Sequence, residues 1–98
     1  MRSTETARPE SGSPPTLEVE VLLFASVAEA VGARRRRLQI PGGATAFYVF
    51  DRLAAGTPSI ARLRPCLSFA VNREFVSGDT VLSAGDELAL IPPVAGGA

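Results

Sequence analysis

The stretch that decides the fold is Leu17-Glu18-Val19-Glu20-Val21-Leu22-Leu23-Phe24-Ala25. Its first five residues alternate strictly between apolar and charged side chains, which predicts a β-strand with one buried face. Successive side chains of a strand point to opposite faces. The buried face is therefore expected to carry Val19, Val21 and Leu23. The opposite face then carries Glu18, Glu20, Leu22 and an outward-pointing Phe24.

A short helix is expected after this strand, over residues 26–31, with Ser26 as its N-cap and Gly32 as its stop. Residues 35–40 then predict a second strand whose Leu38 and Ile40 face the core. Because only one helical turn joins the two strands, they are expected to pair in antiparallel fashion. The basic run Arg34–Arg37 is expected to lie on the solvated surface of this pair, in preference to a partner contact.

One longer helix follows, capped by Thr45 and ended by Gly56. Its core-facing residues recur at helical spacing and are Ala46, Val49, Phe50 and Leu53. Strands are expected at residues 67–71, 74–76 and 87–91, with a tight turn at Asn72-Arg73. The order strand, strand, helix, further strands predicts an α+β domain with one main helix packed on one face of a mixed sheet. The β-grasp (ubiquitin-like) fold fits this order best.

The composition excludes several classes of site. The 98 residues carry no net formal charge, so no global attraction to nucleic acid or anionic membrane is expected. There is no histidine, and the only cysteine is Cys66, which we expect to be a passive, partly buried thiol. We therefore expect no metal site and no bound cofactor. No segment has the length of a membrane span or the apolar core of a secretory signal, which predicts a cytoplasmic protein.

Three parts are expected along the chain. Residues 1–16 are rich in Ser, Thr and Pro and predict a disordered leader. Residues 17–93 form the β-grasp domain, and residues 94–98 form a flexible tail. Pro92 and Pro93 cannot donate to a sheet ladder, so they end the last strand and keep the chain extended. The glycines that follow suit a narrow tunnel in a partner enzyme, although small residues are also common at frayed chain ends.

Three segments resemble the small subunit of molybdopterin synthase. They are Val21-Leu22-Leu23-Phe24-Ala25, Ala70-Val71-Asn72-Arg73-Glu74, and the run from Gly85 to Gly97. The resemblance covers the chain from about residue 18 onward. Its most specific element is the ending Pro-Pro-Val-x-Gly-Gly, because the related thiamin sulfur carriers also end in Gly-Gly but usually lack the Pro-Pro-Val approach.

The resemblance implies a sulfur carrier subunit without an active site of its own, in a cytoplasmic heterotetramer of two small and two large subunits. An adenylating enzyme of the ubiquitin-activator type would consume ATP to adenylate Gly97, and a sulfur donor would convert it to a thiocarboxylate. The large subunit would receive the tail and transfer its sulfur to cyclic pyranopterin monophosphate in molybdenum cofactor biosynthesis. The tail residues that bind there would be Pro92, Pro93, Val94, Ala95 and Gly96.

The resemblance also implies an apolar partner patch formed by Phe24, Phe75 and Ile91. For Phe75, ordinary core packing is an almost equally weighted alternative. Two positions depart from the family pattern. Ala98 follows Gly97 in this sequence, so a peptidase that removes Ala98 is an expected partner. Ala28 stands where the family often has arginine, so one salt bridge with the partner is expected to be missing.

Three other functions remain open from the sequence. A ubiquitin-like protein modifier would use the same adenylated glycine to form bonds with lysines. A sulfur carrier of the thiamin type would share the Gly-Gly ending. A plain β-grasp binding module would leave the tail unused. A stand-alone enzyme is disfavoured because the sequence offers no pair of nucleophile and base.

Overall fold

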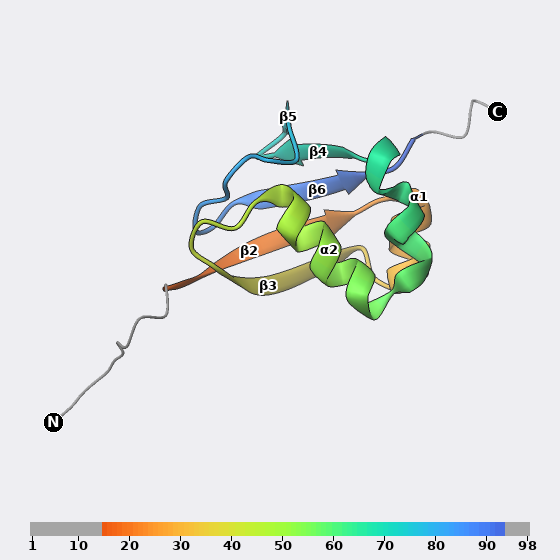
Figure 1. The fold of residues 1–98 in the computed structure, drawn as a ribbon, viewed down its shortest axis with the longest axis horizontal. Helices are drawn as coiled ribbons and strands as arrows, with labels where there is room; N and C mark the ends of the chain where they lie inside the picture. Colours follow the sequence, from red (N-terminus) through yellow and green to blue (C-terminus); the bar gives the residue numbers. More distant parts are fainter. Residues whose placement is uncertain (1–14, 94–98) are drawn as a thin grey trace, which may run out of the picture.

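The computed structural model describes residues 15–93, which form a five-stranded mixed sheet with its helices on one face (Figure 1). The strands lie in the order β3-β2-β6-β4-β5. Their bounds are β2 Thr16–Leu23, β3 Arg35–Pro41, β4 Ser68–Val71, β5 Glu74–Val76 and β6 Glu87–Ile91. The helices are α1 Ala25–Val31, α2 Ala46–Gly56 and the 3₁₀ helix η1 Pro58–Cys66. This arrangement confirms the predicted β-grasp fold.

The first and last described strands lie side by side at the centre of the sheet. β2 runs parallel to β6, with Val21 opposite Leu88, and antiparallel to β3. The other pairings, β4 with β6 and β4 with β5, are antiparallel. Because β2 and β6 are parallel, their carboxyl ends meet at one edge of the sheet. This is the edge at which the chain leaves the domain toward its C-terminus, beside α1 (Figure 1).

The core lies between the sheet and α2, as the alternation in β2 predicts. Val19, Val21 and Leu23 are buried, and so are Leu88 and Leu90 of β6. The buried residues of α2 are Ala46, Val49, Phe50 and Leu53, which are the four expected from helical spacing. The Oγ1 atom of Thr45 accepts a hydrogen bond from the amide of Tyr48 at 3.2 Å, so Thr45 is the predicted N-cap.

The expectation for the start of α1 is wrong. The helix begins at Ala25, so Ser26 lies inside its first turn and does not cap it. The N-cap position is Phe24, which makes no side-chain capping bond. The chain turns there because Ala25 adopts a left-handed φ of 50°, which brings the amides of the first turn onto the carbonyl of Phe24. The end of α1 is as predicted, with Gly32 at a left-handed φ of 84°.

Smaller differences concern the segment borders and Cys66. β2 begins at Thr16, one residue inside the expected leader, while the rest of that leader, residues 1–14, and the tail residues 94–98 lie outside the described part of the chain. Cys66 is exposed, so the expectation of a partly buried thiol is wrong. It is the last residue of η1, whose buried residue is Ile60. Among residues 15–93, no helix is both long and apolar enough to cross a membrane.

Candidate functional site

An apolar row crosses the face of the sheet that lies opposite the core. The register places Leu22 of β2 beside Ala89 of β6, Ala89 beside Ala70 of β4, and Ala70 beside Phe75 of β5. Ile91 belongs to the same face, two residues beyond Ala89. Four strands thus contribute one continuous apolar surface. We call it the open face and define it by these five residues together with Phe24.

The three residues expected to form a partner patch all lie on this open face. Phe24, Phe75 and Ile91 line one shallow hollow of about 380 Å³ with Leu22, Ala70 and Ala89. Phe75 is 75% exposed and Phe24 is 45% exposed. The expectation of an outward Phe24 is therefore confirmed, and the core-packing alternative for Phe75 is excluded. Exposed aromatic side chains grouped in this way mark a surface suited to a protein partner.

Charged side chains surround the open face. Arg35, Arg73 and Glu87 line the rim of the hollow. The Nη1 atom of Arg35 donates to Oε2 of Glu20 at 2.6 Å, an ion pair at the surface. Arg34–Arg37 are all exposed, as expected for a solvated run. An apolar centre with a polar rim is the usual anatomy of a protein–protein interface.

The expected tail begins directly at this surface. β6 ends at Ile91, Pro92 is buried and Pro93 is exposed. Phe24 follows the last residue of the neighbouring parallel strand, so the open face reaches the point where the chain leaves the sheet. The remaining expected tail residues lie outside the described range, and they are Val94, Ala95, Gly96, Gly97 and Ala98. A partner bound to the open face would therefore also contact the chain where the expected tail begins.

The hairpin that carries Phe75 is fixed by Asn72, whose role the sequence analysis missed. Asn72 and Arg73 both have left-handed φ values, 51° and 74°, as a two-residue β-hairpin turn requires. The amide of Asn72 donates to the carbonyl of Glu87 at 2.8 Å, and the amide of Glu87 donates to Oδ1 of Asn72 at 3.0 Å. The Nδ2 atom of Asn72 donates to Oδ1 of Asp86 at 3.0 Å. These bonds join the hairpin to the start of β6.

Replacing Asn72 with alanine is expected to lower the free energy of unfolding by about 2 kcal/mol, from lost hydrogen bonds and an unfavourable left-handed φ. The measurement is urea denaturation followed by circular dichroism. Asn72→Gly is the matched control, because glycine accepts the backbone conformation and loses only the side-chain bonds. It should therefore lose about half as much stability. Equal stability of Asn72→Ala and the parent chain would contradict this role.

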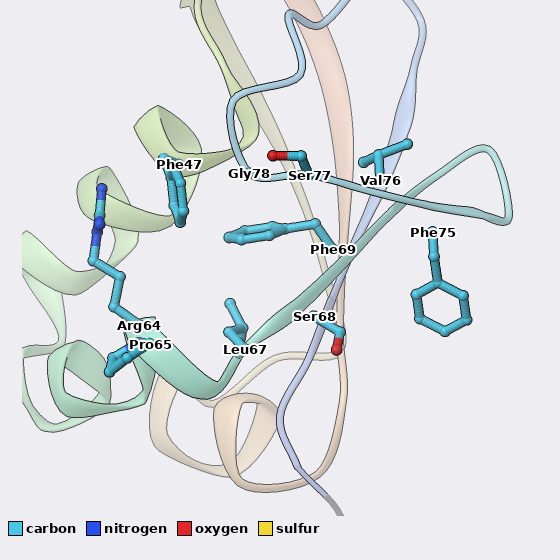
Figure 2. Close-up of a pocket in the computed structure, with 10 residues that line it drawn as sticks. All are labelled: Phe47, Arg64, Pro65, Leu67, Ser68, Phe69, Phe75, Val76, Ser77 and Gly78. Carbon is cyan, nitrogen blue, oxygen red and sulfur yellow. The ribbon is translucent and has the colours of Figure 1, made fainter.

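A second hollow lies beside the same hairpin, where β4 and β5 meet α2 and the end of η1. Figure 2 shows Phe47 and Phe69 pointing toward each other, while Phe75 points away on the other side. The two rings meet edge to face with centroids 5.2 Å apart. The guanidinium of Arg64 lies 4.1 Å from the centre of the Phe47 ring.

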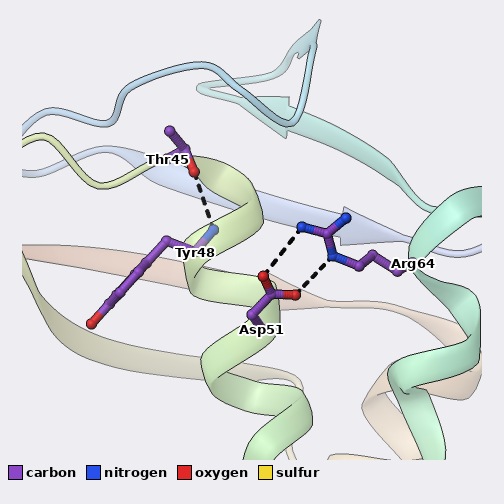
Figure 3. Close-up of polar contacts among 4 residues, drawn as sticks. All are labelled: Thr45, Tyr48, Asp51 and Arg64. Atoms are coloured by element: carbon purple, nitrogen blue, oxygen red, sulfur yellow. Dashed lines mark hydrogen bonds and ion pairs between the residues drawn. The ribbon is translucent and has the colours of Figure 1, made fainter.

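The charge of Arg64 is satisfied by Asp51 (Figure 3). Its Nε donates to Oδ1 at 2.8 Å and its Nη2 donates to Oδ2 at 3.2 Å. The hydrogen bonds that Arg64 donates to the Asp51 carboxylate raise the pKa of Arg64 above its ordinary value. Because the guanidinium of Arg64, the charged group of this second hollow, is already paired within the domain, we assign the hollow a structural role. Within the described residues, no cluster of His, Cys, Asp or Glu could hold a metal ion.

Comparison with known proteins shows extended similarity to sulfur carriers. The model of the ThiS family matches residues 21–97. The molybdopterin synthase sulfur carrier subunit of Arabidopsis thaliana is 36% identical over 93 residues, covering 95% of this chain and 97% of that protein. The subunit of the same name from Homo sapiens is 40% identical over 86 residues, covering 85% of this chain and 98% of that protein.

A solved structure with the same fold belongs to a protein that is not named as a sulfur carrier. The crystal structure of SAMP1 from Haloferax volcanii superposes with a TM-score of 0.70 at 32% sequence identity. The match covers 80% of this chain and 97% of the other. Small archaeal modifier protein 1 of the same organism is 34% identical to this chain over 87 residues.

Proposed function

Because this chain belongs to the ThiS family, together with the molybdopterin synthase sulfur carrier subunits, we propose that it carries sulfur for a molybdopterin synthase. The observation that carries the proposal is the sequence match, over nearly their full length, to two molybdopterin synthase sulfur carrier subunits. The open face supports it, since a carrier must dock on its partners and this domain presents an apolar surface at the root of its tail.

The proposed chemistry takes place on the carboxylate of Gly97. A carboxylate is a poor electrophile, so an adenylating enzyme of the ubiquitin-activator type first joins it to the α-phosphate of ATP and releases pyrophosphate. A sulfur donor then displaces AMP and leaves a thiocarboxylate. The sulfur of that group attacks a carbon of cyclic pyranopterin monophosphate, displaces an oxygen substituent there and forms a thioester. Water then hydrolyses the acyl–sulfur bond, which leaves the sulfur on the pterin and returns the tail as a carboxylate. The protein contributes a narrow, extended tail, because glycine residues have no side chain and allow the backbone to enter a narrow channel.

The proposed partner for sulfur transfer is the large subunit of the synthase. It would cover the open face and receive Pro93, Val94, Ala95 and Gly96 in its channel, whereas Pro92, which the resemblance also implied, is buried in the domain and stays there. Phe24, Phe75 and Ile91 would be the contact residues, and a heterotetramer of two small and two large subunits would result. ATP is consumed by the activating enzyme, so no cofactor is assigned to this chain, and its proposed location is the cytoplasm.

The charging reaction gives the test of this proposal. The chain is incubated with the adenylating enzyme, ATP and a sulfur donor, and its intact mass is measured. A parallel reaction uses a version that ends at Gly97. We expect the shorter version to exchange one oxygen for one sulfur, and the version with Ala98 to remain unchanged until a peptidase removes that residue.

The control for this experiment is a version that lacks Gly96 and Gly97. It should remain uncharged while its circular dichroism spectrum stays that of the folded domain. Absence of sulfur in every version, with an activating enzyme shown to be active on its own substrate, would contradict the carrier function. A plain β-grasp binding module with an unused tail would then be the better description.

A second candidate function is protein modification. It is favoured by the similarity to a protein named as a modifier, small archaeal modifier protein 1. In that case the adenylated glycine would form an amide bond with lysine side chains of other proteins. Covalent conjugates that persist on a denaturing gel, and vanish when Gly96 and Gly97 are deleted, would favour the modifier over the sulfur carrier.

A further inference from the structure

β3 is the outermost strand on its side of the sheet, so every second residue of it turns its main-chain groups away from the sheet (Figure 1). In an antiparallel pair, residues that exchange main-chain hydrogen bonds with the partner strand alternate with residues that do not. The amide of Leu23 in β2 donates to the carbonyl of Arg34 at 2.9 Å, so Arg34 and every second residue after it bond to β2. The main-chain groups of the residues between them, Arg35, Arg37 and Gln39, therefore point outward.

A side chain of α2 confirms this direction and closes one end of the row. The Nη1 atom of Arg52 donates to the carbonyl of Gln39 at 2.5 Å, which requires that carbonyl to point away from β2. Pro41 has no amide hydrogen, and its carbonyl accepts a hydrogen bond within the following turn. Among residues 15–93, no hydrogen bond outside the sheet engages the main chain of Arg35 or Arg37. We call the open groups, the amides and carbonyls of Arg35 and Arg37 and the amide of Gln39, the β3 edge.

The charge along the β3 edge is positive and only partly neutralised. Arg35 donates to Glu20 at 2.6 Å. Arg34 and Arg36 are exposed, and neither forms an ion pair within the described part of the chain. Arg36 lies opposite Val21, which is buried in the core, so the side chain of Arg36 leaves the strand on the side of the helices. An added strand would therefore meet unpaired guanidinium groups as well as open main-chain groups.

The sign of this charge determines which strand fits. An unpaired edge can accept a further strand from another molecule, with main-chain bonds for affinity and side chains for specificity. A second copy of this chain would bring its own arginines to the same edge, and like charges in adjacent strands are destabilising. A strand that carries carboxylates would be attracted instead. The arginines thus disfavour self-pairing and favour an acidic partner.

From this geometry we propose that the β3 edge binds an extended acidic segment of a partner protein by strand addition. The amides and carbonyls of that segment bond to those of Arg35 and Arg37, and carboxylates at every second residue come close to Arg34 and Arg36. β2 separates this edge from β6, the strand that precedes the expected tail. The inference goes beyond the proposed function and does not depend on it, because it uses neither the tail nor the hollow of the open face.

The test uses a short fluorescent peptide, capped at both ends, in which glutamate and valine alternate. Its dissociation constant is measured by fluorescence anisotropy at low and at high salt, and hydrogen exchange of the protein amides is followed by NMR. We expect binding that weakens with salt, and slower exchange at the amides of Arg35, Arg37 and Gln39 in the complex. A peptide of equal charge with proline in place of valine cannot donate main-chain bonds at those positions, so it should bind about tenfold more weakly or worse.

A charge reversal on the protein tests the role of the arginines. Arg36→Glu is expected to weaken binding of the glutamate–valine peptide about tenfold or more at low salt, and less at high salt because exposed charges are screened. Arg62→Glu is the matched control, since it makes the same change of charge at an exposed residue of η1, outside β3, and should leave the affinity close to that of the parent chain. The melting temperature shows that each variant is folded.

The outcomes decide between strand addition and its alternatives. Slower exchange at the three edge amides, together with weak binding of the proline peptide, supports the proposal even if Arg36→Glu fails to fold. Equal binding of the two peptides overturns it, because charge alone then explains the affinity, and so does absence of binding to the parent chain. If the edge amides are already protected in the free protein by a dimer, a second copy is the occupant and the acidic partner is overturned. None of these results bears on the charging of Gly97, which is measured separately.

Discussion

Replacing Phe75 with serine is expected to weaken binding of the large subunit by about 30-fold or more, which corresponds to the 2 kcal/mol typical of an aromatic hot spot. The ring is 75% exposed and lies at the end of the apolar row, where a partner would remove it from water. Because it contributes little to the core, the free energy of unfolding should change by no more than about 0.5 kcal/mol. Calorimetric titration and thermal unfolding of the same samples measure both quantities.

The control for Phe75→Ser is Val81→Ser. Val81 is also a large exposed apolar residue, 59% exposed, but it does not line the hollow of the open face. Its replacement should leave the affinity unchanged. Unaltered binding of Phe75→Ser would show that the open face is not the docking surface. Gross unfolding of Phe75→Ser would instead mean that the residue supports the hairpin as a core residue does.

Replacing Gly78 with alanine is expected to lower the free energy of unfolding by about 3 kcal/mol, the upper range for an overpacked core. An added Cβ would lie 2.5 Å from the Cζ atom of Phe47, which is closer than any real contact. The ring cannot simply move away, because it is held between Phe69 and the guanidinium of Arg64 (Figure 2). The cost is steric, since no left-handed φ is involved at Gly78. Urea denaturation measures it.

Two further variants show whether the clash with Phe47 causes the loss. Gly78→Ala combined with Phe47→Leu should recover part of the stability, which a double-mutant cycle reports as a coupling energy. Gly56→Ala is the matched glycine control. It has no atom within 4 Å of its added Cβ and ends a helix, where alanine is preferred, so it should be neutral or stabilising. If Gly78→Ala is as stable as Gly56→Ala, the assigned packing is wrong.

The elements predicted best from sequence were those whose signal is local and repeated. The strict alternation in β2 gave its buried face, and helical spacing with the Thr45 cap gave α2. The start of α1 was missed because the capping rule assumes an ordinary backbone, whereas Ala25 takes a left-handed conformation that alanine normally avoids. The strand around Phe75 has only three residues, too few for alternation to assign a face. Its pairing with Ala70 was needed to place the ring on the open side.

The candidate site was predictable only in part, and for similar reasons. Phe24, Phe75 and Ile91 were proposed together on the basis of a resemblance, and their meeting in one hollow depends on pairings between distant segments. The bonds of Asn72 with Asp86 and Glu87 join two segments that no local pattern connects. An asparagine in a tight turn was the available signal, but it indicated the turn and not its partners.

The parallel pairing of β2 with β6 also bears on how the protein is made. Contacts between the two ends of a chain form late and slow the folding of a domain. On the ribosome, β2 must wait until the chain has been made as far as β6, Glu87–Ile91, before its neighbour at the centre of the sheet emerges. A nascent chain cut short before residue 87 lacks that central strand and exposes the apolar residues meant to cover it. Chains that lack β6 therefore fail to fold. If they did fold, they would compete for partners although they lack the strand that precedes the tail.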